Sequence, residues 1–263
     1  MHKRGIPTTH IPFHGIQGQQ NSQRLVFVVP YRATTQPERA AHLRRFLTDV
    51  HDQVPGSFVM IAEQCDDHRK FNRGALFNAA VRELPRSFQG AGSITSSDVL
   101  CLHDVDMIPE KSLFDKYTTP LPPQTVRHIG VVDRYSTLGS AYLGGILMIR
   151  VADYIAVNGH SNGFWGWGGE DDEFYKRLKA KHFTIERVIG RVEDLEGFSD
   201  NSQKIAQNIR SKNTGRNKHR GRKRHECNPG LLELKYSLLH DYVDANTGVS
   251  ATRTRARIVL LLE

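Results

Sequence analysis

The sequence predicts an α/β fold in which a mostly parallel central sheet is flanked by helices. Short apolar, β-branched runs alternate with segments of helical periodicity along the first half of the chain. The 263 residues are 38% hydrophobic and 24% charged, which suits one large or two small globular domains with a sizeable core. One of these apolar runs ends at a proline, and another is followed directly by carboxylates. Ligands of α/β sheets bind at the carboxyl ends of the strands, so these two ends are candidates for a binding site.

The first half of the chain predicts three strands and two helices. Residues 25–30 (LVFVVP) form a β-branched run of strand length that ends at a proline. Residues 38–50 place apolar side chains at helical spacing. Residues 58–62, 71–84 and 99–102 continue the alternation as strand, amphipathic helix and strand. Strands that alternate with helices favour parallel pairing.

The second half predicts further strands and one helix. Strands are expected at residues 128–132, 142–151, 183–189, 231–239 and 257–262. A helix is expected at residues 170–181, directly after a glycine-dense stretch. Residues 1–23 are polar, with scattered glycine and proline, and predict a flexible arm, so that residues 24–263 form a single domain.

The positive charge of the chain is concentrated in one segment. The formal net charge is +8, from 36 basic and 28 acidic residues. Nine basic residues and no acids lie between Asn201 and His225, so the rest of the chain has 36 − 9 = 27 basic against 28 acidic residues. We expect residues of about 200–227 to form a mobile basic loop. It lacks the interleaved aromatic residues that stack on bases, so no nucleic acid partner is expected.

Composition also excludes several classes of protein. Three cysteines without a short spacing indicate neither a zinc site nor a disulfide framework. No apolar run approaches the ~20 residues that cross a bilayer, and the N-terminal stretch lacks the apolar centre of a signal peptide. As written, we expect a soluble chain without a membrane span. Its compartment stays open: either the protein works in the cytoplasm, or targeting comes from a partner or from a segment outside this sequence.

An acidic pair follows the expected strand at residues 99–102. Asp104 and Asp106 lie two residues apart, so in an extended backbone both side chains face the same way. Carboxylates suit Mg²⁺ or Mn²⁺, which bridge such groups to substrate phosphates. Aspartates also cap turns, and the pair alone leaves both interpretations open.

The segment FWGWGGEDD, residues 164–172, predicts a sugar site. Gly166 lies between Trp165 and Trp167, and Gly168 and Gly169 follow them. These glycines allow positive φ and expose the indole faces, which commonly stack on sugar rings. Glu170, Asp171 and Asp172 suit the first turn of a helix through its dipole. That alone does not explain the paired tryptophans, whereas a sugar site does, because a carboxylate can accept a hydroxyl proton.

Five blocks, in order, carry a resemblance to a known family: VVPYR (28–32), FNRGALFN (71–78), LHDVDMIP (102–109), YLGGILMI (142–149) and FWGWGGEDDEFYKRL (164–178). The chain resembles the β-1,4-galactosyltransferases, inverting metal-dependent enzymes with a GT-A fold. The sequences HDVD and EDDEFYKRL are most similar to those of the xylosylprotein galactosyltransferase branch of the family. The resemblance implies that residues 24–263 form a GT-A-like catalytic domain.

The resemblance also implies roles for single residues. Asp171 would be the catalytic base, and Asp106 would bind Mn²⁺, with Mg²⁺ as the other candidate cation. The implied acceptor site contains Trp167, Gly169, Glu170 and Asp172. The implied donor site for the UDP-sugar contains Pro30, Tyr31, Arg32, Phe71, Asn72, Arg73, Asp104, Tyr142, Gly144, Gly145 and Trp167.

The chain departs from the family where a histidine usually completes the metal site. Residues 190–197 contain no histidine. Either Asp194 or Glu196 supplies oxygen ligands, which Mn²⁺ accepts, or His219 or His225 folds back from beyond the basic loop. A third hypothesis is that the chain binds metal weakly or not at all and is a catalytically degenerate enzyme.

The expected function is transfer of galactose from UDP-galactose to a terminal sugar hydroxyl of a glycan or glycoconjugate in β-1,4 linkage. The alternatives are transfer from another UDP-hexose, such as UDP-N-acetylgalactosamine, and a catalytically inactive protein that binds glycans or polyanions. Gly169 lies where the xylosylprotein branch carries arginine, so xylose, N-acetylglucosamine and glucose stay open as acceptors.

Overall fold

The computed structural model describes residues 23–32, 38–88, 94–131, 142–197, 202, 229–245 and 254–263. The described strands form one nine-stranded sheet in the order β4-β7-β5-β6-β3-β1-β2-β9-β8. In chain order they are β1 (Leu25–Tyr31), β2 (Phe58–Gln64), β3 (Val99–His103), β4 (Met107–Pro109), β5 (Thr125–Val131), β6 (Ile146–Arg150), β7 (Thr184–Asp194), β8 (Tyr236–Ala245) and β9 (Thr254–Leu262).

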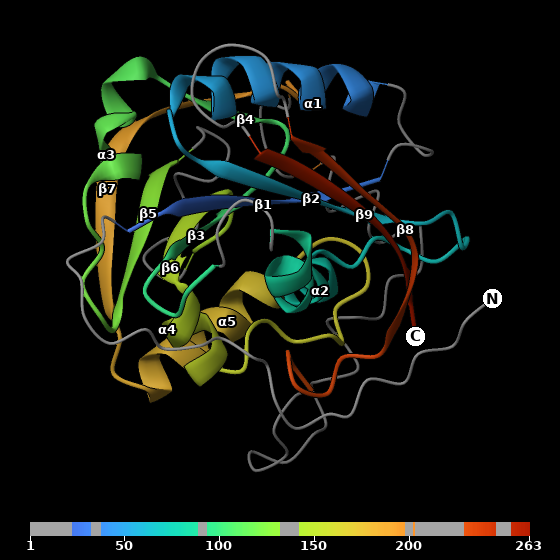
Figure 1. Cartoon of the computed structure of the whole chain (residues 1–263). Helices are drawn as coiled ribbons and strands as arrows, with labels where there is room; N and C mark the ends of the chain where they lie inside the picture. The colour runs from blue at the N-terminus through green and yellow to red at the C-terminus, as the bar shows by residue number, and fades with distance from the viewer. Residues whose placement is uncertain are drawn as a thin grey trace.

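Helices cover both faces of this sheet (Figure 1). Helix α1 (Glu38–Asp49) lies on one face, and α2 (Arg73–Ser87), α4 (Val151–Ala156) and α5 (Glu170–Ala180) lie on the other. The short segments η1 (His51–Gln53), η3 (Lys111–Leu113) and α3 (Asp115–Thr118) complete the described helices. The predicted α/β class is confirmed.

The pairing of the strands is mixed. Strands β3, β1, β2 and β9 form a parallel centre, and β5 pairs with β7 in parallel. Strand β6 runs antiparallel to both β3 and β5, and the β4–β7 and β8–β9 pairs are antiparallel as well. The parallel centre agrees with the mostly parallel sheet predicted from the sequence, but half of the eight described pairings are antiparallel.

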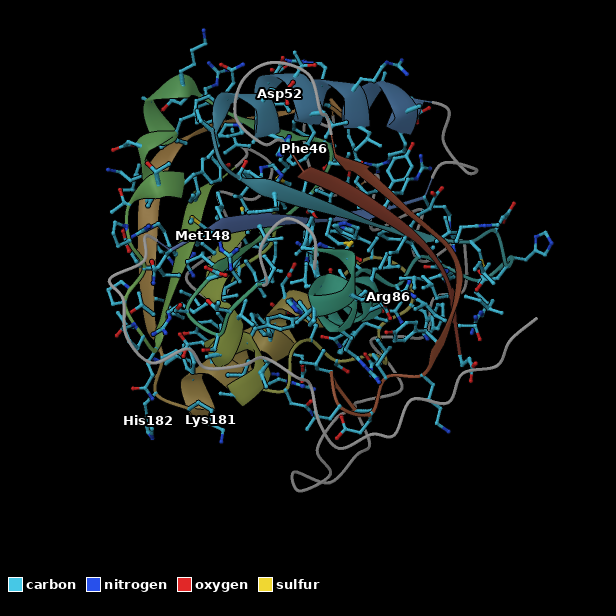
Figure 2. All side chains as sticks on the ribbon, in the orientation of Figure 1. Phe46, Asp52, Arg86, Met148, Lys181 and His182 are labelled. Atoms are coloured by element: carbon cyan, nitrogen blue, oxygen red, sulfur yellow. The ribbon has the colours of Figure 1, made fainter. Side chains whose placement is uncertain are left out.

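Strand β1 shows how one strand supplies both halves of the core. Every residue of β1 is buried, because helices cover both faces of the sheet. Val26 and Val28 face the cluster formed with α2, α4 and α5, whereas Phe27 and Val29 face the cluster formed with α1. Figure 2 labels Phe46 where it points from α1 toward the sheet, and its ring lies 5.6 Å from that of Phe27.

Some element boundaries differ from the prediction for local reasons. Helix α2 begins at Arg73 because the Asn72 side chain accepts a hydrogen bond from the Ala75 amide and caps the helix. The apolar residues Leu231 and Leu234 are buried in a turn, and strand β8 begins later, at Tyr236. Of the strand expected at residues 142–151, only Ile146–Arg150 is strand (β6); residues 142–145 precede it, and Val151 begins the short helix α4.

Two predicted segments lie outside the described residues. These are the N-terminal arm, of which residue 23 alone is described, and the basic loop at about 200–227, of which Ser202 alone is described. Among the described helices, none has the length and hydropathy required to cross a membrane.

Candidate active site

The candidate site lies at the carboxyl edge of the parallel strands. Strands β1, β2 and β3 end at Tyr31, Gln64 and His103, so the segments that follow them gather on the same edge of the sheet. The buried His103 ring orients the acidic loop, because its Nδ1 donates a hydrogen bond of 2.8 Å to the Asp104 carbonyl. The Asp104 amide in turn donates to the Gly145 carbonyl at 3.0 Å.

Arg73 joins the acidic loop to the start of α5. Its Nε donates to Asp104 Oδ1 at 2.6 Å, and its Nη1 donates to Asp171 Oδ1 at 2.7 Å. The same Nη1 lies 3.7 Å from Glu170 Oε1. The guanidinium also lies 4.7 Å from the centre of the Phe77 ring. A single, partly buried cation therefore pairs with acidic side chains that come from two distant segments of the chain.

Glycines present the acidic turn of α5 to this site. Gly166, Gly168 and Gly169 have φ of +91°, +95° and +100°, which side chains other than glycine rarely adopt. The Gly166 amide donates to the Phe71 carbonyl at 2.7 Å, which fixes the turn against the segment that precedes α2. This explains why one glycine lies between the two tryptophans and two more lie directly before Glu170.

The glycines of the YLGG block lie against the acidic turn. A Cβ added to Gly144 would lie 2.6 Å from Asp171 Oδ2, so the backbone passes directly beside this carboxylate. His128 Nε2 donates to the Gly144 carbonyl at 2.7 Å, and Arg187 donates to the Tyr142 carbonyl at 2.9 Å. No sequence pattern indicated His128 or Arg187, because each lies within a strand outside the motif blocks.

Burial raises the pKa values of two carboxyl groups around Arg73. Burial, with Asp106 and Asp171 adding to it, raises the pKa of Asp104 to about 6, although Arg73 acts in the opposite direction. Burial and the neighbouring Asp171 raise the pKa of Glu170 to about 8. Perturbed carboxyl groups that converge on one point are typical of functional sites.

The Glu170 shift predicts a pH-dependent difference between the wild type and Glu170→Gln. Between the ordinary pKa of 4.5 and about 8, the folded protein holds a proton on Glu170 that the unfolded chain has released. The free energy of unfolding therefore falls as pH rises through this window, by at most about 1.4 kcal/mol per pH unit. Urea unfolding from pH 5 to 8 should show the wild type losing stability relative to Glu170→Gln. Parallel pH profiles would contradict the assignment.

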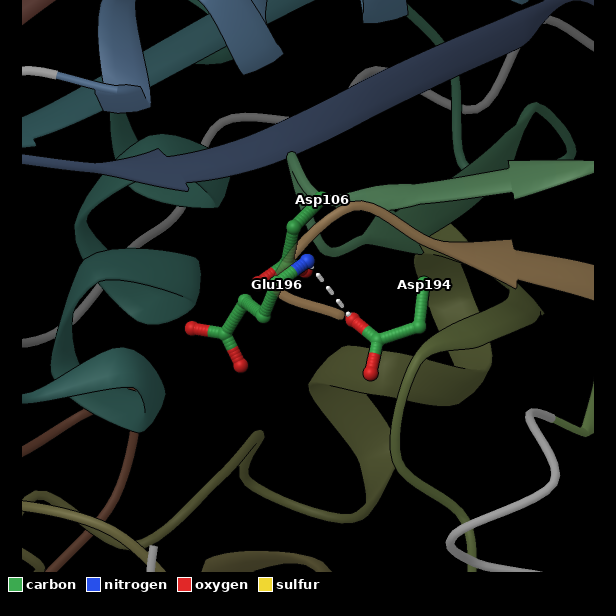
Figure 3. A group of neighbouring side chains, drawn as sticks. All are labelled: Asp106, Asp194 and Glu196. Atoms are coloured by element: carbon green, nitrogen blue, oxygen red, sulfur yellow. Dashed lines mark hydrogen bonds between the residues drawn. The ribbon is translucent and has the colours of Figure 1, made fainter. Parts of the chain in front are cut away.

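A second acidic group lies two residues along the loop from Asp104. Ligand oxygens of Asp106, Asp194 and Glu196 all lie within 4.8 Å of one another. Figure 3 shows these side chains converging, with the Glu196 amide donating to the Asp194 carboxylate at 3.0 Å. Pairing of β4 with β7 sets Met107 opposite Asp194, and the Leu195 amide donates to the Asp106 carbonyl.

This group can be compared with the alternatives that the sequence left open for the metal ligands. Asp194 and Glu196 are the acids that the structure brings to Asp106, whereas His219 and His225 lie outside the described residues. Arg39 of α1 forms ion pairs with both Asp106 and Glu196. Oxygen donors of this kind suit Mg²⁺ or Mn²⁺, and a positive group already lies among them, so the residues fit a divalent cation.

Several predicted donor-site residues also carry structural contacts. Arg32 is buried, donates to the Arg69 carbonyl at 2.8 Å and lies 6.0 Å from the Phe71 ring centre. Asn72 is fully buried, and its side-chain amide donates to the Asn162 carbonyl. Pro30 and Tyr31 lie within β1, where they pair with Ala62 and Glu63 of β2.

The two tryptophans of the FWGWGGEDD segment lie in different surroundings. Trp165 packs against the core cluster on the α2 face, with the Arg69 guanidinium 4.6 Å from its ring centre. Arg69 also donates to the carbonyl of Leu262 in β9. Trp167 packs against the cluster on the α1 face, to which Tyr142 also belongs. In the acceptor set, Gly169 is half-buried and Asp172 is exposed beside Asp171.

Comparison with known proteins agrees with this arrangement. A family model described as the N-terminal domain of galactosyltransferase matches residues 127–200. Xylosylprotein 4-beta-galactosyltransferase of Caenorhabditis elegans is 32% identical over 181 residues, which are 65% of this chain and 56% of that protein. Human beta-1,4-galactosyltransferase 3 is 30% identical over 224 residues, which are 82% of this chain and 48% of that protein. The chain thus spans about half the length of these relatives.

The fold has a solved counterpart as well. The catalytic domain of Drosophila beta1,4-galactosyltransferase 7 in complex with xylobiose matches with a TM-score of 0.60 at 23% identity, over 92% of this chain and 95% of that one. A mutant of that protein in complex with manganese, UDP-Gal and xylobiose matches with a TM-score of 0.59 at 22% identity, over the same shares of the two chains. The fold is that of the GT-A glycosyltransferases. The chain belongs to the β-1,4-galactosyltransferase family.

Proposed function

We propose that this chain is an inverting, metal-dependent galactosyltransferase that moves galactose from UDP-galactose to a terminal sugar hydroxyl in β-1,4 linkage. The observation that carries the proposal is the pairing of Arg73 with both Asp104 and Asp171. This pairing sets the residue proposed as base beside the acidic loop that also contributes Asp106. The curated relatives carry galactosyltransferase names, which supports the same reaction class.

Asp171 is the proposed general base. It lies in the first turn of α5, is partly exposed, and has the Gly144 backbone beside one oxygen and Arg73 on the other. An acceptor hydroxyl bound in front of α5 would give its proton to Asp171 as its oxygen attacks the anomeric carbon. One displacement inverts the configuration, so the reaction needs no protein nucleophile.

Asp106, Asp194 and Glu196 are the proposed metal ligands. A divalent cation bound there supplies Lewis-acid neutralisation of the charge that develops on the departing diphosphate. The residues contribute oxygen donors from the loop after β3 and from the end of β7, and the Leu195 amide holds the two segments together. Manganese is the metal in a structural neighbour, which makes Mn²⁺ the first cation to test.

The metal site predicts a specific defect for Asp106→Asn. This variant should lose most Mn²⁺-dependent UDP binding, because a neutral amide replaces the central carboxylate of the group. Titration calorimetry with UDP, with and without Mn²⁺, measures the effect. Asp115→Asn, an exposed carboxylate that pairs with Lys116, is the matched control and should bind as the wild type does. Equal Mn²⁺ dependence in the two variants would contradict the assignment of Asp106.

A screen of donors and acceptors tests the function as a whole. Purified protein is incubated with UDP-galactose, UDP-N-acetylgalactosamine or UDP-glucose and with xylose, N-acetylglucosamine or glucose, with and without Mn²⁺. We expect a β-1,4-linked galactoside, identified by NMR, in the presence of the metal. The absence of turnover with every donor would overturn the enzymatic proposal and favour the glycan-binding alternative.

Xylose is the proposed first acceptor to examine. The C. elegans relative is named for a xylosylprotein substrate, and the Drosophila structures contain xylobiose. Gly169 adopts a φ of +100° and has no side chain to occupy the acceptor region, so N-acetylglucosamine and glucose belong in the same screen.

A further inference from the structure

Arg39 forms ion pairs with two of the three carboxylates of the proposed metal site. Its Nη1 donates to Asp106 Oδ2 at 2.7 Å, and its Nη2 donates to Glu196 Oε1. Arg39 lies in the first turn of α1, 67 residues from Asp106 and 157 residues from Glu196 in the sequence. The fold therefore delivers a guanidinium to the same carboxylates that would bind a divalent cation.

The surroundings of Arg39 stabilise this contact. The Arg39 side chain is 18% exposed, and those of Asp106 and Glu196 are 9% and 6% exposed. Burial acts to lower the pKa of Arg39, but Asp106 and Glu196 outweigh it and raise the pKa overall. Buried carboxylates without a counter-charge are costly, so Arg39 compensates the acidic group when no metal is bound.

A guanidinium and a divalent cation compete for this position. Both need the charge and the lone pairs of the Asp106 and Glu196 carboxylates, and a metal at bonding distance requires those oxygens to turn toward it. Two cations among the same carboxylates would also repel each other at short range. Arg45, on the same helix, is no competitor, because it pairs with Asp49 and Glu193 at the surface.

We propose that Arg39 is an exchangeable internal cation of the metal site. Without a divalent cation it neutralises Asp106 and Glu196, and metal binding displaces it. The inference rests on the proposed metal ligands and adds a residue that sets the affinity for the metal. Arg39 thus stabilises the metal-free protein and weakens metal binding through the same two contacts.

Metal titration of Arg39→Gln tests this proposal. If Arg39 occupies the site in about nine-tenths of the metal-free molecules, its removal should tighten Mn²⁺ binding about tenfold. Free Mn²⁺ is followed by electron paramagnetic resonance in the absence of nucleotide, so the readout does not depend on turnover. Arg45→Gln, the same change at an exposed position of the same helix, should bind Mn²⁺ as the wild type does.

Thermal unfolding supplies a second readout. Metal-free Arg39→Gln should melt below the wild type, and saturating Mn²⁺ should raise its melting temperature by more than it raises that of the wild type. If the glutamine variant does not fold, Arg39→Lys keeps a positive charge but loses the two-pronged contact, and it should tighten Mn²⁺ binding to a smaller degree.

The outcomes separate this proposal from the function on which it rests. Wild-type or weaker Mn²⁺ affinity in the Arg39 variants, with wild-type binding still dependent on Asp106, would overturn the role of Arg39 alone. If neither the wild type nor the variants bind Mn²⁺, both the metal site and the role of Arg39 are wrong.

Discussion

Replacement of Asp171 by asparagine should reduce galactose transfer by about 10²–10⁴-fold, the usual contribution of a general base. The amide keeps the size of the side chain but cannot take the acceptor proton. Arg73 retains its contact with Asp104, so the fold and the affinity for UDP should change little. Initial rates with saturating donor, and calorimetry with UDP and Mn²⁺, measure the two properties separately.

The matched control for Asp171 is Asp115→Asn, which changes an exposed aspartate in α3 outside the site. It should transfer galactose at the rate of the wild type. An Asp171→Asn variant that retains full activity would show that another group accepts the proton. A variant that loses UDP binding as well would show that Asp171 supports the donor site rather than the chemistry.

Replacement of Arg73 by methionine should lower the free energy of unfolding by about 3–5 kcal/mol, the usual cost of removing one partner from a buried ion pair. Asp104 and Asp171 would then lie beside Glu170 without their shared cation. Arg73→Lys keeps the charge but cannot contact two carboxylates in the same geometry, so it should be intermediate. Urea unfolding at pH 7 measures the loss.

A pH series distinguishes electrostatic loss from simple loss of packing. The deficit of Arg73→Met should shrink as pH falls, because protonation neutralises the carboxylates that Arg73 no longer balances. Arg45→Met is the control, since this exposed arginine should change stability by about 0.5 kcal/mol or less. A deficit that stays constant from pH 8 to 5 would mean that contact with Phe77 accounts for the loss.

Local patterns in the sequence were sufficient to predict most of the central elements. The β-branched run of β1 and the helical period of α1 both lie where they were expected. Strand β4 was not predicted, because a strand of three residues that ends in proline is too short to show an alternation of apolar and polar side chains. Helix α4 was not predicted, because its residues, VADYIA, directly follow an apolar strand. In addition, a helix of six residues is too short to show a helical repeat.

The candidate site could be predicted in part. The motif blocks pointed to Asp104, Asp106 and Asp171, and they also placed Arg73 in the donor site, but they did not show that Arg73 links two of these carboxylates. These contacts could not be predicted from local patterns, because Asp104 and Asp171 lie far from Arg73 in the sequence. No sequence pattern indicated a role for Arg39, because α1 also contains Arg44 and Arg45. Only the packing of α1 against the acidic loop, which brings Arg39 to Asp106, distinguishes it from them.

The place of β9 in the sheet has a consequence for synthesis of the protein. Strand β9 pairs in parallel with β2. Its Leu262 carbonyl accepts a hydrogen bond from Arg69, whose guanidinium lies over the Trp165 ring. On a translating ribosome, β2 therefore has an open flank until this late segment leaves the exit tunnel, and an open strand flank invites aggregation. Deletion of residues 254–263 should consequently leave β2 with an unpaired flank and yield protein that precipitates.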